Sequence, residues 1–468
     1  MGIVSQRMQH KLRVTLACVF YMLPASMHAF SAYSNSELDQ LEKEFVQQIN
    51  QSNQVIRDPL GNQYINQLAR RLAQHGELKQ PYFFIVNSSE INAFAGPGGY
   101  IGVNSQLILA SETESELAAV MAHEMSHVRQ HHLYRMLEHQ KQMRVPMLAS
   151  LLASMALGVL NPVLGSGALM GSLTGFAQDN ISFVRSNEKE ADRIGIDMLI
   201  KSGLDPRGMA GFFKKMQQNS RYAYADNVPA MLRSHPLDDD RIAEAENRSL
   251  HLAAKDHPNS LDYEVFKELI RVSVSTEPKS LLDVHTPVFK TEYARIAHQY
   301  GQALVLLKMN RFQSAITILN PLLIDHPHQA FSLAMAHAEI GAGQAASALR
   351  RVSELQANFP DNYAVIMHHA EILLDSNRAE SAASLLLKAS RQFKNDLAIC
   401  EELARAQAAS HRKGYAYFTL AQCYLLQGEA RTAMRTLKVA KKLAKHDAIL
   451  SARVVAKMDE IKLDDLPD

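Results

Sequence analysis

The pentapeptide His123-Glu-Met-Ser-His127 is the part of the sequence whose residue types most clearly indicate chemistry. Residues four apart lie on one face of an α-helix, so both imidazoles can bind the same metal ion. Glu124 follows the first imidazole directly and is placed to polarise a water molecule on that ion. Zinc lowers the pKa of such a water toward roughly 7 and polarises a scissile carbonyl, while the glutamate acts as general base. The motif therefore predicts metal-assisted hydrolysis of a peptide bond.

A five-residue motif also occurs by chance, and a catalytic zinc site needs a third protein ligand. The metzincin spacing requires Gly at position 130 and His at position 133, but Gln130 and Leu133 stand there. The third ligand must therefore come from elsewhere in the chain. Glu188 and Asp192 are four residues apart in a second predicted helix and share a face. One of them can bind the ion while the other orients a histidine ligand.

Two helices and a stretch of extended chain must position these groups. The apolar, alanine-rich run that leads into the histidine motif predicts the metal-binding helix, with a capping box of Ser111 and Glu114 at its start. Upstream, the apolar run 82–86 leads into a Gly/Pro turn and then into Tyr-Ile-Gly-Val at 100–103. This pattern predicts a β-hairpin beside the metal-binding helix.

Four segments together resemble the HtpX-type and CAAX-prenyl-protease-type zinc metallopeptidases, over residues 35 to 245. They are Asn-Ala-Phe-Ala-Gly-Pro-Gly-Gly-Tyr at 92–100, the histidine motif, Glu-Lys-Glu-Ala-Asp at 188–192 and Ser-His-Pro-Leu at 234–237, and they keep the order of the family. The resemblance implies one zinc ion per chain. It assigns the ligands to His123, His127 and Glu188 and the catalytic role to Glu124, and it matches Asp192 to the aspartate that follows the glutamate ligand.

The segment 92–100 is a candidate for binding substrate. Peptidase clefts often bind a substrate by adding its backbone to an exposed strand edge, and glycines permit close approach. The alternative is a purely structural hairpin. The candidate residues are Asn92, Ala93, Phe94, Gly98 and Gly99.

Three further histidines and an arginine lie near the motifs. His235 can stabilise the oxyanion, or it can contact zinc as a fourth ligand and hold the enzyme latent. Arg241 follows six residues later and can contribute in a similar way. His131 and His132 extend the metal-binding helix, and we expect both to be bystanders because zinc already has its ligands.

The N-terminal residues predict an export signal. Three basic residues precede an apolar run at 14–23, small residues follow, and cleavage is expected after Ala29. Removal of 1–29 leaves Cys400 and Cys423, which either form one disulfide in an oxidising compartment or remain buried thiols.

The length of 468 residues predicts two folded domains rather than one core. We expect a mainly α protein: an α+β zincin-type protease domain with a small β-sheet at 30–255, a helix and linker at 256–287, and an α-solenoid at 288–468. The formal net charge of +1 provides no electrostatic footprint for binding nucleic acid.

The C-terminal part contains an internal repeat. A turn residue and a small residue recur at steps of 33 and 34 residues, which is typical of tetratricopeptide repeats, although the chain has no Trp. An irregular solenoid is the alternative. Gly428 and Ala433 repeat the pair 51 residues later, so the last unit should hold an extra segment near 397–413. The turn residues are Asn310, Gly343 and Asn377, and the small residues are Ala315, Ala348 and Ala382.

Two surfaces of the predicted fold are candidates for contacts with other molecules. The basic residues of the last repeat follow a spacing that places them on one helix face, which is either merely solvated or a docking site for acidic groups. They are Arg431, Arg435, Lys438, Lys442 and Lys445. The uncharged segment 145–178 is split by Asn161-Pro162. We expect it to form two apolar helices beside the cleft that can touch a membrane surface peripherally; a membrane span is the alternative.

An export signal, this protease domain and C-terminal repeats together resemble repeat-bearing members of the family in Gram-negative bacteria. The resemblance implies a periplasmic protease that degrades misassembled outer-membrane β-barrel proteins and assists their assembly. The repeats would then engage the outer-membrane assembly machinery. The alternative is a chaperone or adaptor whose metal site is latent and which acts by binding proteins.

Overall fold

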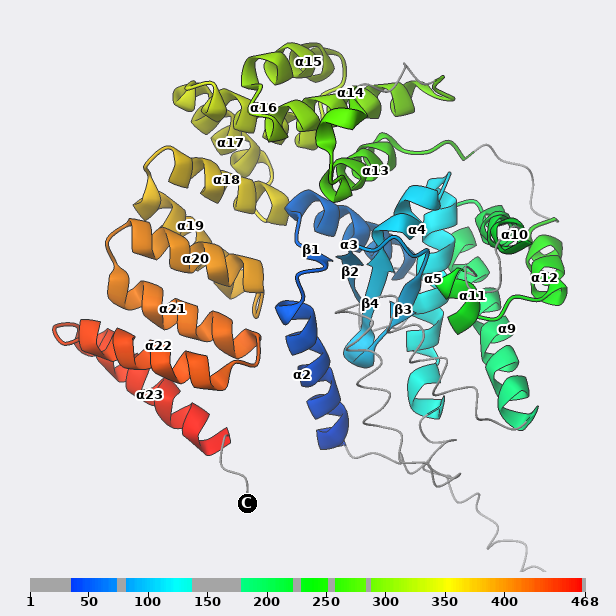
Figure 1. Ribbon diagram of the computed structural model, residues 1–468, viewed down its shortest axis with the longest axis horizontal. Coiled ribbons are helices and arrows are strands. Elements are labelled where there is room, and N and C mark those ends of the chain that lie inside the picture. Colours follow the sequence, from blue (N-terminus) through cyan, green and yellow to red (C-terminus); the bar gives the residue numbers. More distant parts are fainter. Residues whose placement is uncertain are drawn as a thin grey trace, which may run out of the picture.

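The computed structural model describes residues 35–73, 81–136, 178–221, 229–250, 257–282 and 288–464. In this part of the chain, helices predominate around one small sheet, which confirms the predicted mainly α fold class. Helices and strands up to α12 gather around the sheet, and a curved series of helices from α14 to α23 lies beside them (Figure 1). The predicted export signal and residues 145–177 of the uncharged segment lie outside the described residues.

The first part combines a four-stranded sheet with helices whose apolar side chains pack with those of the sheet in one core. Its strands are β1 (Val55–Ile56), β2 (Tyr82–Val86), β3 (Ala93–Ala95) and β4 (Tyr100–Asn104), with the 3₁₀ turn η1 at Pro97–Gly99. Its helices are α2 (Asn35–Gln51), α3 (Pro59–Ala73), α4 (Ser105–Ala110), α5 (Glu114–Arg129), α9 (Gln178–Lys201), α10 (Arg207–Arg221), α11 (Ala230–Ser234) and α12 (Asp239–Leu250).

The sheet has the order β1-β2-β4-β3, and its pairing corrects the predicted hairpin. Strands β2 and β4 run parallel, with Tyr82 opposite Tyr100. The antiparallel hairpin is instead β3–β4, joined through η1, with Phe94 opposite Gly102. The segment between β2 and β4 contains the additional strand β3, which runs antiparallel to β4. The chain therefore reverses direction between β3 and β4, and β4 runs in the same direction as β2. Strand β3 is left at the edge of the sheet.

Helix α5 lies at the centre of this part and is buried from Ser115 to Ser126. It packs against α9 and α10, and β3 and α3 also contact it. Close approach to α9 and α10 depends on glycines. A Cβ on Gly195 would lie 3.3 Å from the backbone nitrogen of His123, and a Cβ on Gly208 would lie 2.5 Å from the carbonyl oxygen of Ser115.

Helix α13 (Leu261–Val274) occupies the region predicted as a helix and linker, followed by η3 (Pro278–Leu281). Its N-terminus is capped by Ser260, whose hydroxyl accepts a hydrogen bond from the backbone of Tyr263. Tyr263 and Phe266 belong to the core around α5. Val265 and Leu269 belong to the core of the first repeats. The helix therefore shares its apolar surface between the two parts of the molecule.

The second part is a series of helices in which each packs against the next, as expected for an α-solenoid. The helices are α14 (Glu292–Lys308), α15 (Phe312–Asp325), α16 (Gln329–Gly341), α17 (Ala345–Asn358), α18 (Tyr363–Asp375), α19 (Ala379–Gln392), α20 (Leu397–Ala409), α21 (Lys413–Leu426), α22 (Ala430–Leu443) and α23 (Ala448–Asp464).

The repeat continues further than the turn residues alone indicate. Asn310, Gly343 and Asn377 adopt positive φ angles of 57°, 77° and 58°, and His411 does the same at 62°. His411 lies the same step of 34 residues after Asn377, so the extra segment near 397–413 is largely helix α20, one half of a fourth helix pair. Histidine lacks the Gly or Asn signature of a left-handed turn, which is why the sequence pattern did not reveal this unit.

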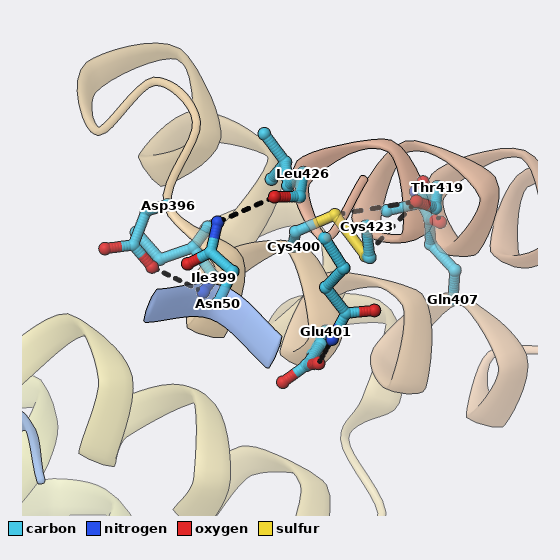
Figure 2. The surroundings of a disulfide bond; sticks show 10 residues. Asn50, Asp396, Ile399, Cys400, Glu401, Gln407, Thr419, Cys423 and Leu426 are labelled. Atoms are coloured by element: carbon cyan, nitrogen blue, oxygen red, sulfur yellow. Dashed lines mark hydrogen bonds between the residues drawn. A yellow bond between two sulfur atoms is a disulfide. The ribbon is translucent and has the colours of Figure 1, made fainter. Parts of the chain in front are cut away.

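A disulfide joins α20 to α21. Cys400 and Cys423 are bonded, with their Cα atoms 5.7 Å apart, so the structure contains the bridge rather than two free thiols. Figure 2 shows the end of α2 beside this bridge: the Asn50 side-chain amide donates a hydrogen bond of 2.9 Å to the carbonyl oxygen of Leu426. The first described helix of the chain therefore contacts its late repeats.

In the described part of the chain, none of the helices combines the length and apolar character that a membrane span requires.

Candidate metal centre

Helix α5 presents the histidine motif on a buried and well-capped helix. Its N-cap is Thr113, whose side chain accepts a hydrogen bond from the backbone of Glu116, and Glu116 in turn accepts one from the backbone of Glu112. The predicted cap, Ser111, instead donates its hydroxyl to the carbonyl oxygen of Leu107 in α4. The cap lies later than predicted because α4 extends to Ala110 and leaves no room for an earlier start.

The two histidines of the motif face Glu188 on α9. The Nε2 atoms of His123 and His127 are 3.0 Å apart. The Glu188 carboxylate lies 3.3 Å from Nε2 of His123 and 3.4 Å from Nε2 of His127. His235, at the end of α11, adds its Nδ1 atom 3.3 Å from Nε2 of His123. One ligand atom from each of these four residues lies within 4.8 Å of every other.

Glu124 lies beside this cluster without a hydrogen-bonding partner for one carboxylate oxygen. Its side chain is 1% exposed, and Oε1 makes no hydrogen bond. Nε2 of His235 lies 3.4 Å from that oxygen. A buried carboxylate oxygen without a donor costs free energy, so the arrangement favours a site completed by a small polar species such as water.

Asp192 and Arg241 hold the cluster in place through hydrogen bonds that involve the Nδ1 atom of His123 and the Asp192 carboxylate. Asp192 accepts a hydrogen bond from Nδ1 of His123 at 2.9 Å, which directs Nε2 of the same ring toward Glu188. Arg241 donates to both carboxylate oxygens of Asp192, at 2.7 and 2.8 Å, and lies 3.0 Å from Glu188. Burial opposes ionisation of Asp192, but the hydrogen bonds from His123 and Arg241 outweigh it and lower its pKa. The sequence pattern predicted for Arg241 a contribution similar to that of His235, and the structure instead pairs Arg241 with Asp192 and Glu188.

The burial and the charges of the cluster shift the pKa values of its members in opposite directions. Burial lowers the pKa of His127 well below its usual range, despite the attraction of Glu188. Burial alone would raise the pKa of Glu188, but the surrounding imidazoles hold it well below its usual range. For His123, burial disfavours the charged ring, yet hydrogen bonds to Asp192 and Glu188 raise its pKa to about 10. Any metal that binds here must displace that proton, so binding weakens in acid.

His132 is not the bystander that the sequence analysis expected. Its Nδ1 atom lies 2.9 Å from Nδ1 of His127, and its Nε2 atom lies 3.2 Å from Glu190 on α9. The chain reverses direction at His131, which has a φ of 53° after the end of α5. This turn returns His132 to the outer side of His127. Helical periodicity cannot predict this contact, because His132 lies beyond the end of α5.

The candidate substrate segment lies along β3 and η1. Ala93 and Phe94 are in the edge strand β3, which contacts α5. Gly98 and Gly99 have φ angles of 71° and 85°, as the tight turn requires. A Cβ on Gly98 would meet the side chain of Glu42 from α2 at 2.4 Å. The space beside Gly98 is therefore filled by α2.

The donor set fits a divalent metal ion. Two imidazole nitrogens and a carboxylate oxygen from two helices, with a third imidazole beside them, form the chemistry of a catalytic zinc site. His123, His127 and Glu188 would hold the ion, and His235 is placed to complete the shell. A bound ion would supply a Lewis acid that acidifies water and polarises a carbonyl group.

The fold and site define a metal-dependent hydrolase with a histidine-glutamate motif on a central helix. Peptidase family M48 matches residues 59–249, which include α3, strands β2 to β4, α5 and the segments around Glu188 and His235. The chain belongs to this family, and it is a metallopeptidase.

Several relatives extend the match to the repeats. The beta-barrel assembly-enhancing protease of Escherichia coli is 33% identical over 443 residues, which covers 93% of this chain and 90% of the relative. The protein of the same name from Yersinia pestis is 33% identical and covers 89% and 87%. The mitochondrial metalloendopeptidase OMA1 of Danio rerio is 26% identical over 216 residues, 44% of this chain and 45% of the relative.

Proposed function

We propose that the chain is a zinc-dependent endopeptidase whose ion is held by His123, His127 and Glu188. The observation that carries the proposal is the approach of Glu188 on α9 to within 3.4 Å of both imidazoles of the motif. Two nitrogens and one carboxylate favour zinc over magnesium or calcium, which prefer oxygen ligands. Glu124 is the general base, since its carboxylate is buried beside the cluster with an oxygen free of hydrogen bonds.

The surrounding residues have distinct roles in this proposal. Asp192 orients His123, and Arg241 holds Asp192 in place. His235, whose Nδ1 atom lies 3.3 Å from Nε2 of His123, would either complete the shell of the ion as a fourth ligand or stabilise the oxyanion. The edge strand β3, with Ala93 and Phe94, binds the substrate backbone.

We further propose that the enzyme acts in the periplasm on misassembled outer-membrane β-barrel proteins and assists their assembly. The name shared by the relatives that match nearly the whole chain supports this substrate class. The disulfide between Cys400 and Cys423 is consistent with an oxidising compartment. The solenoid, proposed as tetratricopeptide repeats, would present a surface for the assembly machinery.

Replacing Glu124 with Gln tests the enzymatic proposal. The amide keeps the size of the side chain but cannot accept the proton of the attacking water. We expect proteolysis of an unfolded outer-membrane protein to fall by more than about 100-fold, because a general base contributes that much or more. Metal content should stay equal to that of the wild type, measured by mass spectrometry of the purified protein.

The outcome also separates the enzyme from an adaptor. If cells that carry Glu124→Gln assemble and degrade outer-membrane proteins as wild-type cells do, the chain acts chiefly by binding. Glu114→Gln is the matched control. Glu114 is the first residue of α5, at the opposite end of the helix from the histidine motif, and it accepts a hydrogen bond from the hydroxyl of Tyr64. That variant should keep its protease activity.

A further inference from the structure

A second group of metal-ligating side chains lies among the repeats, separate from the M48 site. His337 on α16 and His368 and Glu371 on α18 each present one ligand atom within 4.8 Å of the others. His368 and Glu371 are three residues apart on α18, so they share a face of that helix. His337 reaches them from the preceding repeat. None of these residues lies in the part of the chain that matches the peptidase family.

The geometry of this group resembles that of the candidate metal centre. Nε2 of His337 and Nδ1 of His368 are 2.9 Å apart, close to the 3.0 Å between the imidazoles of His123 and His127. Glu371 Oε2 is 3.8 Å from each of these two nitrogens. Tetrahedral bonds of about 2.0–2.1 Å place two nitrogen ligands somewhat over 3 Å apart. A small rotation of the Glu371 side chain would complete the arrangement.

The group is accessible, unlike a histidine pair enclosed in a core. The side chains of His337 and His368 are 24% and 14% exposed, and that of Glu371 is 46% exposed. An ion can therefore enter from solvent, and water can occupy a fourth position. Two imidazoles and one carboxylate suit zinc and neighbouring transition metals, while calcium and magnesium prefer oxygen ligands.

The charges around the group are also suited to a cation. Burial, followed by the repulsion of the neighbouring His337, lowers the pKa of His368 to about 3. Asp58, which caps the N-terminus of α3, faces the same region. Burial raises the pKa of Asp58, and repulsion by Glu371 adds to the effect. A bound cation would relieve this repulsion between carboxylates.

We propose that His337, His368 and Glu371 form a second binding site for a divalent transition metal, zinc in the first place. The site joins α16 to α18, and Leu60 of the peptidase part packs against an apolar cluster to which both helices contribute. Metal bound there would hold two consecutive repeats together at their contact with α3. This proposal does not depend on the one made for the M48 site.

The metal content of the full-length, tag-free protein tests the proposal. After loading with zinc and removal of free ions, wild type should hold two zinc ions per chain. His368→Asn and His337→Asn should each hold one. The matched control is His369→Asn, since His369 is the next residue on α18 and is also half-buried, but lies outside the group. That variant should hold two ions.

A second pair of variants separates the two sites. His127→Asn, which removes a ligand of the M48 site, should keep one ion, and His127→Asn combined with His368→Asn should keep none. Loading the His127→Asn protein with Co²⁺ should produce visible absorption bands of a low-coordinate cobalt site, and Glu371→Gln should shift or abolish them. Glu371 is exposed enough for this substitution to leave folding intact, which circular dichroism verifies.

The proposal is overturned if the His127→Asn protein, whose M48 site has lost a ligand, binds no zinc ion. It is also overturned if the second ion persists when His337 and His368 are both replaced by Asn. In that case the contact between the two rings is only a hydrogen bond, and the second ion binds elsewhere.

Discussion

At the scale of single residues, the candidate centre shows how buried charges are made tolerable. Glu188, Asp192 and Arg241 are all nearly inaccessible, with 3%, 6% and 2% of their surfaces exposed. Each is compensated by at least one opposite charge or hydrogen bond from the others. Removal of one partner therefore leaves an uncompensated group, which is costly in a buried site. The metal ligands depend on this support as much as on their own identity.

Asp192→Asn is the substitution that tests this support. The amide can still contact Nδ1 of His123, but it no longer carries the charge that Arg241 neutralises. We expect zinc affinity to fall by about 10–100-fold, as is common when the partner of a histidine ligand is replaced. Competition with a chromogenic chelator measures the affinity.

Asp197→Asn provides the control for Asp192→Asn, because Asp197 is on the exposed face of the same helix. It should bind zinc as tightly as wild type. Equal zinc affinity in Asp192→Asn and wild type would contradict the orienting role of Asp192.

At the scale of elements, the site requires that α9 and α10 approach α5 closely. Two glycines of α10 differ in how near they come to the start of α5. A Cβ on Gly208 would lie 2.5 Å from the carbonyl oxygen of Ser115, which is backbone and cannot move aside alone. A Cβ on Gly211 would lie 3.5 Å from Glu116 Oε1, an ordinary contact. The two positions therefore respond differently to the same substitution.

Gly208→Ala should lower the free energy of unfolding of the peptidase part by about 1–3 kcal/mol, the usual cost of overpacking. Gly211→Ala should be neutral or stabilise by up to about 1 kcal/mol, because alanine is the better helix former. Urea denaturation followed by circular dichroism measures both. Equal stability of the two variants would show that α10 can shift away from α5 without cost.

At the scale of the whole molecule, the peptidase part and the repeats are joined through shared apolar surface. Leu60 on α3 packs against the core of the first repeats and against the cluster that contains α16, α17 and α18 residues. The side chain of Gln63 accepts a hydrogen bond from the backbone of Ala364 at the start of α18. Helix α13 contributes to both cores, and Asn50 binds the late repeats. The repeats thus form an integral support of the peptidase part.

Leu60→Ala should weaken this support by about 2 kcal/mol, the lower end of the range for truncating leucine, because the side chain is only half-buried. We expect faster amide hydrogen exchange in α16 and α18, measured by mass spectrometry. Leu60→Met, which conserves volume, should exchange like wild type. If exchange in α16 and α18 is unchanged by Leu60→Ala, the repeats are stable without this contact.

Much of the architecture follows from local patterns in the sequence. The spacing of His123 and His127, the alanine-rich run before them and the steps between Asn310, Gly343 and Asn377 are all short-range features. They predict a helix with two ligands on one face and a series of helix pairs, because backbone geometry relates residues a few positions apart. The types of the side chains also indicate the chemistry, since imidazole and carboxylate groups are suitable ligands for transition metals when several of them converge.

Only the tertiary structure decided which distant groups meet. The parallel pairing of β2 with β4, the return of His132 to His127 and the bridging of Asp192 by Arg241 all depend on how elements pack. The same is true of the contact between His337 and His368, which lie in successive repeats. Sequence spacing carries no information about these distances, because they arise from the burial of apolar surfaces between helices that the chain connects only through turns.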